Sequence, residues 1–338
     1  MTFAPILRLL HERQTLSTAQ AHEAFRAMMA GEVSHGEMGA LLAFLSLRVP
    51  TADELLGAAQ VMRDNVSRLQ TQTPPEHIVD TCGTGGAPKT FNVSTLAGIV
   101  AAASGVKIAK HGNRSRTGRG SAELLGALGV QLEAPVEVQA ACLDQVGICF
   151  CFAIKHHPAM RNVAPVRQAM GFPTIFNLLG PLTNPAGAKR QVLGVYDARF
   201  LEPVASTLRA LGASRAMVVH SDDGLDEISI SAGTALVHVT QAGITHARVV
   251  PEELGLVRAP REQVAALDLP HAVRLARAIL QGDERGAPRD AVLMTAAAAL
   301  LVDDKVPSML EGVRVAAASL DSGRAAATLQ AWIDISRG

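Results

Sequence analysis

Apolar residues recur at helical spacing in the first part of the chain. The segments with this period are "AFRAMM", "MGALLAFLSL" and "LLGAAQVM". Each follows a hydroxyl residue that has Gln or Glu three positions later, which is the sequence pattern of a capping box. These pairs are Ser17 with Gln20, Ser34 with Glu37, and Thr51 with Glu54. The pattern predicts an array of short helices, with Gly31 ending the first and Pro50 closing the second.

After "TQTPPE", which we interpret as a hinge, short β-rich runs alternate with helical stretches. The β-rich runs are "HIVD", "VKIAKH", "ICFCFAI", "QVLGVY" and "AMVVHS". The helical stretches between them are "STLAGIVAAASG", "SAELLGALG", "PVEVQAACLDQVG" and "EPVASTLRALGAS". This alternation predicts a mostly parallel sheet with helices on both faces.

The last third of the chain predicts additions to this sheet. The runs "EISISAGTALVHVT" and "THARVV" suggest antiparallel strands, and "HAVRLARAIL" and "RDAVLMTAAAALLV" suggest closing helices. The expected fold class is therefore α/β: a small all-helical domain, residues 1–72, hinged to a larger domain, residues 73–338. The larger domain has a central, mostly parallel sheet flanked by helices. In such sheets ligands bind beyond the carboxyl ends of the strands, where the βα loops emerge.

Composition narrows the class of function. Zero net charge and only 3% aromatic residues disfavour a nucleic-acid binder, which usually has a basic excess and stacking aromatics. The four cysteines show no paired CxxC spacing, so neither a zinc site nor a redox dithiol is expected. The apolar stretches are too short to span a membrane, and the first residues lack a signal-peptide pattern. We expect a reduced, cytoplasmic enzyme.

The stretch "DTCGTGGAPKTFNVST", residues 80–95, follows the first predicted strand. Gly83, Gly85 and Gly86 permit positive φ and leave no Cβ in the way of an approaching anion. Successive N–H groups of such a turn, with the following helix N-terminus, form an anion site. Neutral hydrogen-bonding side chains follow: Thr84, Thr90, Asn92, Ser94 and Thr95. The spacing fits neither the dinucleotide nor the ATP glycine motif. The alternative is a simple glycine turn capped by Ser94.

Two further motifs contain basic and amide side chains. "AKHGNRS" follows a predicted strand and brings four such residues into one loop: Lys110, His111, Asn113 and Arg114. "HHPAMRNVAPVR" adds His157, Met160 and Arg167 in a predicted helical neighbourhood. This density of functional side chains is unusual for simple turns, so it favours a ligand site.

Two more motifs supply backbone and carboxylates. "TIFNLLGPLTNPAG" is a connection with Gly180 and Pro181, and "SDDGLDEIS" presents Asp226 and Glu227 after a predicted strand. Oxygen ligands of this kind suit Mg²⁺, which keeps several waters and shares itself with substrate phosphates. We expect the preceding acids, Asp222 and Asp223, to lie in a solvated turn.

Together these motifs resemble the anthranilate phosphoribosyltransferase family, and the match runs in the same order from about residue 10 to 335. The matching motifs are GTGG followed by TFNVST, KHGNRS, HPAMRNVAPVR, TIFNLLGPLTNPAG and GLDEIS. The resemblance implies transfer of a phosphoribosyl group from phosphoribosyl pyrophosphate to anthranilate, in the second step of tryptophan biosynthesis. It also implies hinges between the two domains and a homodimer through the helical domains. A segment at about 168–188 is expected to return to the helical domain.

The resemblance assigns roles to the matching residues. Those for the phosphoribosyl donor are Gly83, Thr84, Gly85, Gly86, Thr90, Asn92, Ser94, Thr95, Lys110 and Ser121. Those for Mg²⁺ are Ser94, Asp226 and Glu227. Those for anthranilate are Gly83, His111, Asn113, His157, Arg167 and Gly180. Lys110, His111 and Arg167 are the catalytic candidates; Arg167 would bind the anthranilate carboxylate, while His111 would either assist the amine or shape the pocket.

Two loops depart from the family pattern. In "GTGGAPKTFN" Ala87 replaces the usual acid, and "RTGRGSAE" replaces a serine-rich stretch; both loops are about one residue shorter. Arg116 and Arg119 make this region more cationic, which would suit a polyanionic donor with fewer metal ions. The other interpretation, which we favour, is drift in loops that bind the same molecule. Thr117 and Ser121 are only candidates for the lost serine roles.

Two rival functions stay open at this point. A nucleoside phosphorylase of related fold has a glycine-rich phosphate loop and a stretch similar to "TGRG", but not the pattern "GLDE" or "RNVAPVR". A nucleic-acid-binding relative would use a basic patch, here Arg114, Arg116, Arg119, Lys107 and Lys110. The zero net charge disfavours that second rival.

Overall fold

The computed structural model describes residues 3–88, 90–115 and 118–338. Its N-terminal part is helical: α1 (Ala4–His11), α2 (Thr18–Ala30), α3 (His35–Ser46) and α4 (Ala52–Asp64). All three predicted capping boxes are present, at the starts of α2, α3 and α4. Gly31 ends α2 in the left-handed conformation, with φ of 76°. The predicted helical array is therefore confirmed, although α3 already ends at Ser46, before Pro50.

A seven-stranded sheet lies at the centre of the larger domain, in the order β3-β2-β1-β4-β5-β6-β7. Its strands are β1 (Ile78–Gly83), β2 (Lys107–Gly112), β3 (Ile148–Phe152), β4 (Arg190–Gly194), β5 (Arg215–Ser221), β6 (Thr234–Thr240) and β7 (Ile244–Val249). The first five strands are parallel, and β6 and β7 are added antiparallel. The predicted sheet is confirmed, except that residues 227–233 of "EISISAGTALVHVT" belong to no strand.

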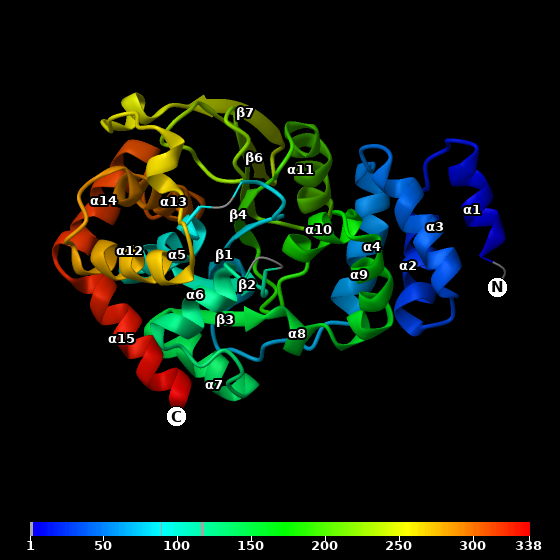
Figure 1. Ribbon diagram of the computed structural model, residues 1–338, viewed down its shortest axis with the longest axis horizontal. Coiled ribbons are helices and arrows are strands. Elements are labelled where there is room, and N and C mark those ends of the chain that lie inside the picture. Colours follow the sequence, from blue (N-terminus) through cyan, green and yellow to red (C-terminus); the bar gives the residue numbers. More distant parts are fainter. Residues whose placement is uncertain (1–2, 89, 116–117) are drawn as a thin grey trace.

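Helices cover both faces of this sheet (Figure 1). The connecting helices are α5 (Val93–Ala103), α6 (Ser121–Leu128), α7 (Val136–Ala141) and α11 (Leu201–Ala210). The closing helices are α12 (Leu269–Gln281) and α13 (Ala287–Val302), followed by α14 (Met309–Asp321) and α15 (Arg324–Arg337), which the sequence pattern does not single out. Alternate residues enter different cores: Val192 and Met217 pack with α5 and α13, whereas Leu193 and Val218 pack with α11 and the helical domain.

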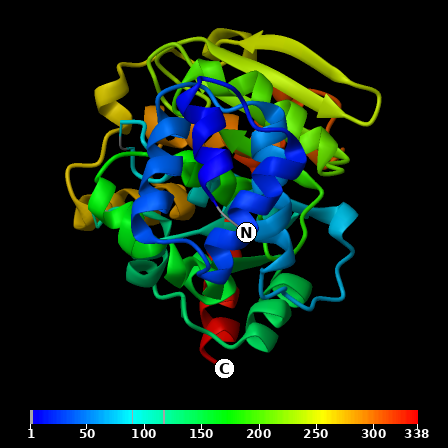
Figure 2. The same ribbon diagram turned by 90° about the vertical axis from the view of Figure 1, so that its right-hand side faces the viewer.

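The chain returns to the helical domain in its middle. After α8 (Ala153–His156), helix α9 (Ala164–Met170) contacts α3, and α10 (Ile175–Leu179) contacts α4. Figure 2 views the molecule from this helical end, with the blue N-terminal helices in front of the sheet. The loops from the carboxyl edge of the parallel strands therefore meet residues of the returning segment.

Candidate active site

The motif residues lie at the carboxyl ends of neighbouring parallel strands. β1 ends at Gly83, β2 at Gly112, β4 at Gly194 and β5 at Ser221, and the loops that follow carry the predicted donor and metal residues. Because parallel strands end at the same edge, loops far apart in sequence meet there. The hydrogen bond from the Gly85 N–H to Asp226 Oδ2, at 3.0 Å, joins two of these loops.

Glycines make room for the acidic loop as well as for a ligand. A Cβ at Gly83 would lie 2.6 Å from Asp226 Oδ2, and one at Gly194 would lie 1.7 Å from the Asp226 carbonyl oxygen. Gly85 and Gly86 have φ of 64° and 98°, which favour glycine. Gly83 and Gly86 are exposed, so a ligand can reach the turn. Sequence reasoning missed Gly194, whose signal would have been its place at a strand end.

Three hydrogen bonds at Thr84 join the glycine turn to other segments of the chain. Its N–H donates to the Gly194 carbonyl at 2.9 Å, and its Oγ1 accepts from the Tyr196 N–H at 3.1 Å. Its carbonyl accepts from the Asn177 side chain at 3.3 Å. The Tyr196 ring also lies beside Gly86, where a Cβ would approach it to 3.3 Å. Tyr196 and Asn177 are site residues that the motifs did not single out.

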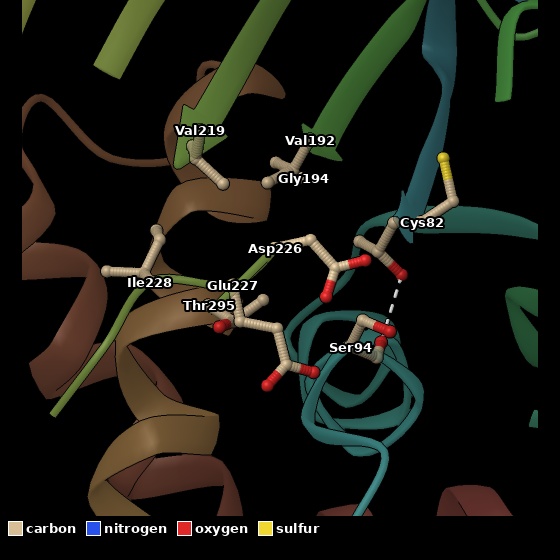
Figure 3. Close-up of a pocket in the computed structure, with 10 residues that line it drawn as sticks. Cys82, Ser94, Val192, Gly194, Val219, Asp226, Glu227, Ile228 and Thr295 are labelled. Atoms are coloured by element: carbon tan, nitrogen blue, oxygen red, sulfur yellow. Dashed lines mark hydrogen bonds between the residues drawn. The ribbon is translucent and has the colours of Figure 1, made fainter. Parts of the chain in front are cut away.

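Figure 3 shows the acidic pair at a small cavity of about 10 Å³, which is close to the room needed by one water molecule. Its lining residues are Thr81, Cys82, Ser94, Val192, Gly194, Val219, Asp226, Glu227, Ile228 and Thr295. The Glu227 carboxylate accepts from Thr90 Oγ1 at 3.2 Å. Loss of hydration and the neighbouring Asp226 raise the pKa of Glu227 to about 7. A cation would therefore be favoured beside this pair.

The oxygen atoms at this cavity fit a magnesium ion that is shared with a substrate. The residues described by the structure include no group of three or more His, Cys, Asp or Glu side chains able to hold a metal ion. Two carboxylates and the Ser94 hydroxyl line the same cavity. Mg²⁺ is commonly bound in this way, through one or two carboxylates, waters and substrate phosphates.

Lys110 is buried beneath the glycine turn. Its Nζ donates to the Thr81 carbonyl at 2.5 Å and to Ser94 Oγ at 3.2 Å. Burial lowers the pKa of Lys110, while the nearby Asp80 carboxylate opposes that shift. The alternative of a Ser94 cap is wrong: α5 begins at Val93, and Ser94 lies within its first turn.

The start of α5 contains two more predicted donor residues. Asn92 is the N-cap in the left-handed conformation, and its side chain donates to the Arg119 carbonyl at 3.3 Å instead of capping the helix. Thr95 is 1% exposed, and its Oγ1 has no hydrogen-bond partner within the described part of the chain. Asn92 thus joins the first predicted donor loop, "GTGGAPKTFN", to Arg119 of the second, "RTGRGSAE".

The predicted acceptor residues His111, His157 and Gly180 are in contact. His111 Nδ1 lies 3.1 Å from the Gly180 carbonyl oxygen, and the Nε2 atoms of His111 and His157 lie 3.2 Å apart. Burial lowers the pKa of His111 well below its ordinary value and that of His157 to about 4. A carbonyl only accepts, so neutral His111 carries its proton on Nδ1. Its Nε2 then accepts from His157.

Arg167 and Asn113 have different environments. The Arg167 guanidinium lies 5.1 Å from the Phe176 ring centre, and burial lowers the pKa of this arginine. Within the described ranges no carboxylate forms an ion pair with it, and burial is the cause of its pKa shift. Asn113 is exposed, and its Oδ1 accepts from the Arg114 N–H at 2.8 Å. No hydrogen bond among these described residues joins Arg167 or Asn113 to the histidine pair.

The second donor loop is tied to the protein by Arg119. Its guanidinium donates to the carbonyls of Ala266 and Leu267, at 2.7 and 3.1 Å. Ser121 begins α6, and a Cβ at Gly112 would lie 2.5 Å from its Oγ. The other candidates in this loop, Arg116 and Thr117, lie outside the described residues.

Similarity to known proteins agrees with this architecture. Residues 4–66 match the model of the "Glycosyl transferase family, helical bundle domain", and residues 75–326 match its "a/b domain". Fold and site together therefore define a two-domain glycosyltransferase. Within the described residues no helix is both long and apolar enough to cross a membrane.

Individual relatives define the family more narrowly. The chain is 46% identical to the anthranilate phosphoribosyltransferase of Rubrobacter xylanophilus over 333 residues, which are 98% of this chain and 96% of the relative. The crystal structure of the Thermus thermophilus enzyme (TrpD) is 43% identical and has a TM-score of 0.92, with 98% of this chain and 99% of that chain covered. The Saccharomyces cerevisiae enzyme in complex with PRPP and Mg is 25% identical and has a TM-score of 0.90, with 99% and 98% covered.

The chain belongs to the anthranilate phosphoribosyltransferase family, a family of tryptophan biosynthesis. The resemblance recognised from its motifs, the predicted fold class and the enzyme class are confirmed.

Proposed function

We propose that this chain transfers the phosphoribosyl group of phosphoribosyl pyrophosphate to the amine of anthranilate. The products are N-(5-phosphoribosyl)-anthranilate and pyrophosphate. The observation that carries the proposal is the 3.0 Å contact between the Gly85 N–H and Asp226, because it brings an anion-binding turn and a cation-binding acid together. A magnesium-bound diphosphate needs both at one place.

The donor would bind along the exposed glycine turn. Gly83, Thr84, Gly85 and Gly86 would cradle the diphosphate along backbone that the glycines keep clear, while the Thr84 and Gly85 N–H groups hold the turn through the Gly194 carbonyl and Asp226. The remaining proposed donor contacts are Thr90, Asn92, Ser94, Thr95, Lys110 and Ser121. Lys110 Nζ is already directed at Ser94, so its charge lies beside the position where negative charge grows as the bond to pyrophosphate breaks. This is the catalytic role that we propose for Lys110.

Ser94, Asp226 and Glu227 would hold Mg²⁺, which the S. cerevisiae relative binds together with PRPP. When bound, the ion neutralises charge on the departing diphosphate. Asp226 and Glu227 would keep it in place while the glycine turn excludes side chains from the same space. The raised pKa of Glu227 supports this use, since a bound cation restores the ionised form.

Anthranilate would bind on the side of the returning segment, at Gly83, His111, Asn113, His157, Arg167 and Gly180. Arg167 would orient it through a bidentate pair with its carboxylate. His111 already uses both ring nitrogens, one with the Gly180 carbonyl and one with His157. This supports a role for His111 in shaping the pocket, and the free aromatic amine needs no strong base.

We also propose the wider arrangement implied by the family. The helical domain would comprise residues 1–72 with the returning segment at about 168–188, and the donor-binding domain residues 73–338. The helical domain would form a homodimer, for which the exposed Leu47 offers apolar surface. The enzyme would act in the cytoplasm, without nucleic acid or membrane. Light scattering after size exclusion would test the dimer.

One experiment tests the reaction itself. The protein is mixed with phosphoribosyl pyrophosphate and Mg²⁺, and pyrophosphate release is measured with and without anthranilate. Release that depends on anthranilate is expected. Phosphorolysis of uridine or thymidine would instead support the phosphorylase rival, and absence of both reactions would contradict the proposal.

A further inference from the structure

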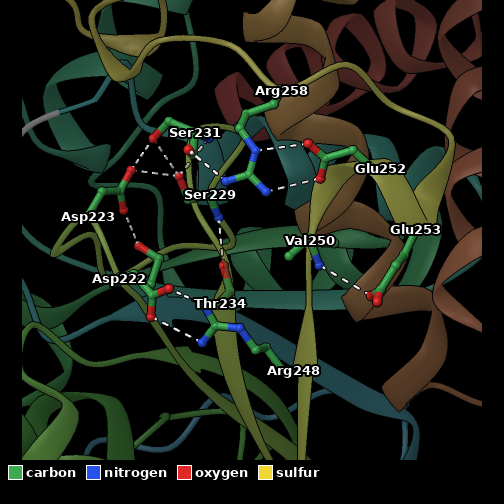
Figure 4. Close-up of polar contacts among 11 residues, drawn as sticks. Asp222, Asp223, Ser229, Ser231, Thr234, Arg248, Val250, Glu252, Glu253 and Arg258 are labelled. Carbon is green, nitrogen blue, oxygen red and sulfur yellow. Dashed lines mark hydrogen bonds and ion pairs between the residues drawn. The ribbon is translucent and has the colours of Figure 1, made fainter.

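Two adjacent acids in the turn after β5 have opposite environments (Figure 4). Asp222 is exposed and forms an ion pair with Arg248. Asp223 turns inward, where its carboxylate accepts hydrogen bonds from three serine hydroxyls. The expectation of a solvated turn is therefore confirmed for Asp222, whereas Asp223 is half-buried in the same turn and hydrogen-bonded within the protein.

The Asp223 carboxylate joins the two limbs of the loop that carries the acidic pair. Its Oδ1 accepts from Ser221, the last residue of β5, at 2.5 Å. Its Oδ2 accepts from Ser229 at 2.7 Å and from Ser231, both of which lie on the limb that returns to β6. Asp226 and Glu227 lie between these limbs in sequence. This side chain thus braces a loop whose base is closed by the β5–β6 ladder and by the Asp222 N–H, which donates to the Gly233 carbonyl at 2.9 Å.

No strand pairs with the returning limb in the described part of the chain. Besides Asp223, the Thr234 hydroxyl accepts from the Ser229 N–H at 3.0 Å, and the Ala259 N–H donates to the Ile230 carbonyl at 3.1 Å. Ile228 and Ile230 are each 1% exposed and enter the core, while Ser229 and Ser231 face Asp223. This alternation explains why the sequence suggests a strand at residues 227–231. In the structure the carboxylate accepts from the two serine hydroxyls on the polar side of the limb.

Backbone contacts frame the same loop. Ser221 and Leu225 exchange hydrogen bonds on the outgoing limb, and Arg261 donates to the Asp223 carbonyl at 3.1 Å. Burial opposes ionisation of Asp223, but the serine hydroxyls outweigh it and keep its pKa below the ordinary value. The carboxylate is therefore an ionised acceptor for all three hydroxyls.

We propose that Asp223 is a positioning residue: it fixes the loop geometry in which Asp226 and Glu227 receive the divalent cation and the donor diphosphate. The inference rests on the metal role proposed above for these two acids. Residues that orient metal ligands without touching the ion commonly change metal affinity by about 10- to 100-fold when removed. Asp223 acts on the ligands through the backbone limbs on either side of them.

The test measures cation binding and not turnover. Mn²⁺ serves as the probe, and its free concentration is followed by electron paramagnetic resonance with the full-length protein and saturating phosphoribosyl pyrophosphate. A titration of the donor alone gives the baseline. The variant Asp223→Ala should weaken protein-dependent Mn²⁺ binding about tenfold or more. The matched control Asp222→Asn removes a negative charge one residue away and should leave binding unchanged.

Further variants separate the possible outcomes. If Asp223→Ala does not fold, Ser231→Ala removes a single donor to the same carboxylate and should weaken binding in the same direction, with Tm close to that of the parent. Equal effects of the Asp222 and Asp223 variants would overturn the inference, because charge alone would then explain them. Unchanged Mn²⁺ binding in Asp223→Ala would overturn it too. The variant Asp226→Asn shows where a failure lies: if it binds Mn²⁺ normally, the proposed metal site itself is wrong.

Discussion

The two proposed halves of the active site, one for the phosphoribosyl donor and one for the acceptor, are built by opposite means. The donor side is formed by backbone: Gly83 and Gly194 leave space that Asp226 fills, and a turn N–H points at that acid. The acceptor side is formed by buried side chains, the neutral imidazoles of His111 and His157. The donor side is therefore vulnerable to an added methyl group, whereas the acceptor side is vulnerable to a lost side chain.

Adding a methyl group at Gly83 should have the largest effect. The new Cβ would lie 2.6 Å from Asp226 Oδ2, so the carboxylate must move out of its present place. We expect Gly83→Ala to lower kcat/KM for phosphoribosyl pyrophosphate by about a hundredfold, the scale of a displacement of about 1 Å at a reacting centre. Steady-state kinetics with varied donor measure this.

The control for that variant is Gly36→Ala. Gly36 is an exposed residue of α3 where a Cβ would meet nothing within 4 Å. It should keep the parent activity. A Gly83→Ala enzyme whose kcat/KM stayed within about threefold of the parent would show that the donor side does not depend on backbone clearance.

Removing the Arg167 side chain should have the next largest effect, on the other half of the pocket. A hydrogen bond to a charged group is worth about 1.5–3 kcal/mol, so Arg167→Ala should raise the KM for anthranilate about 10- to 100-fold. The KM for the donor should change far less. Both constants are measured in one kinetic series, and equal changes in the two would contradict the assignment of Arg167 to the acceptor.

Burial of the histidine pair should make the stability of the protein depend on pH, because burial disfavours the protonated imidazole. The unfolded chain binds a proton on His157 near pH 6.5, but the folded pKa is about 4. Folding is therefore penalised as the pH falls from 6.5 toward 4, by about 2 kcal/mol between pH 7 and pH 5. Between pH 7 and pH 5 the free energy of unfolding of the variant His157→Asn should therefore fall by about 2 kcal/mol less than that of the parent. Denaturant unfolding at the two pH values measures this difference.

If His157→Asn kept the parental pH dependence, the imidazole of His157 would have to be hydrated in the folded protein, and the contrast between the two halves would disappear.

Much of the architecture was predictable because it depends on local chemistry. Ser17, Ser34 and Thr51 begin helices through contacts within one turn. The glycine turn is recognisable from its composition alone. The roles of Gly194 and Asp223 were not predictable in that way. Gly194 meets the Asp226 backbone only once the sheet has formed, and Asp223 lies in a turn, where an acid is usually solvated.

The smallest expected effect concerns Arg119, and it tests whether the second donor loop contributes charge or only position. Its guanidinium donates to the carbonyls of Ala266 and Leu267. Arg119→Ala should therefore lower the free energy of unfolding by about 1 kcal/mol while the KM for phosphoribosyl pyrophosphate rises less than about threefold. Denaturant unfolding measures the effect on stability, and donor kinetics on the same preparation measure the effect on donor binding. A tenfold rise in the donor KM with unchanged stability would mean that Arg119 contacts the donor phosphates, and the donor side would then depend on a side-chain charge as well as on its backbone.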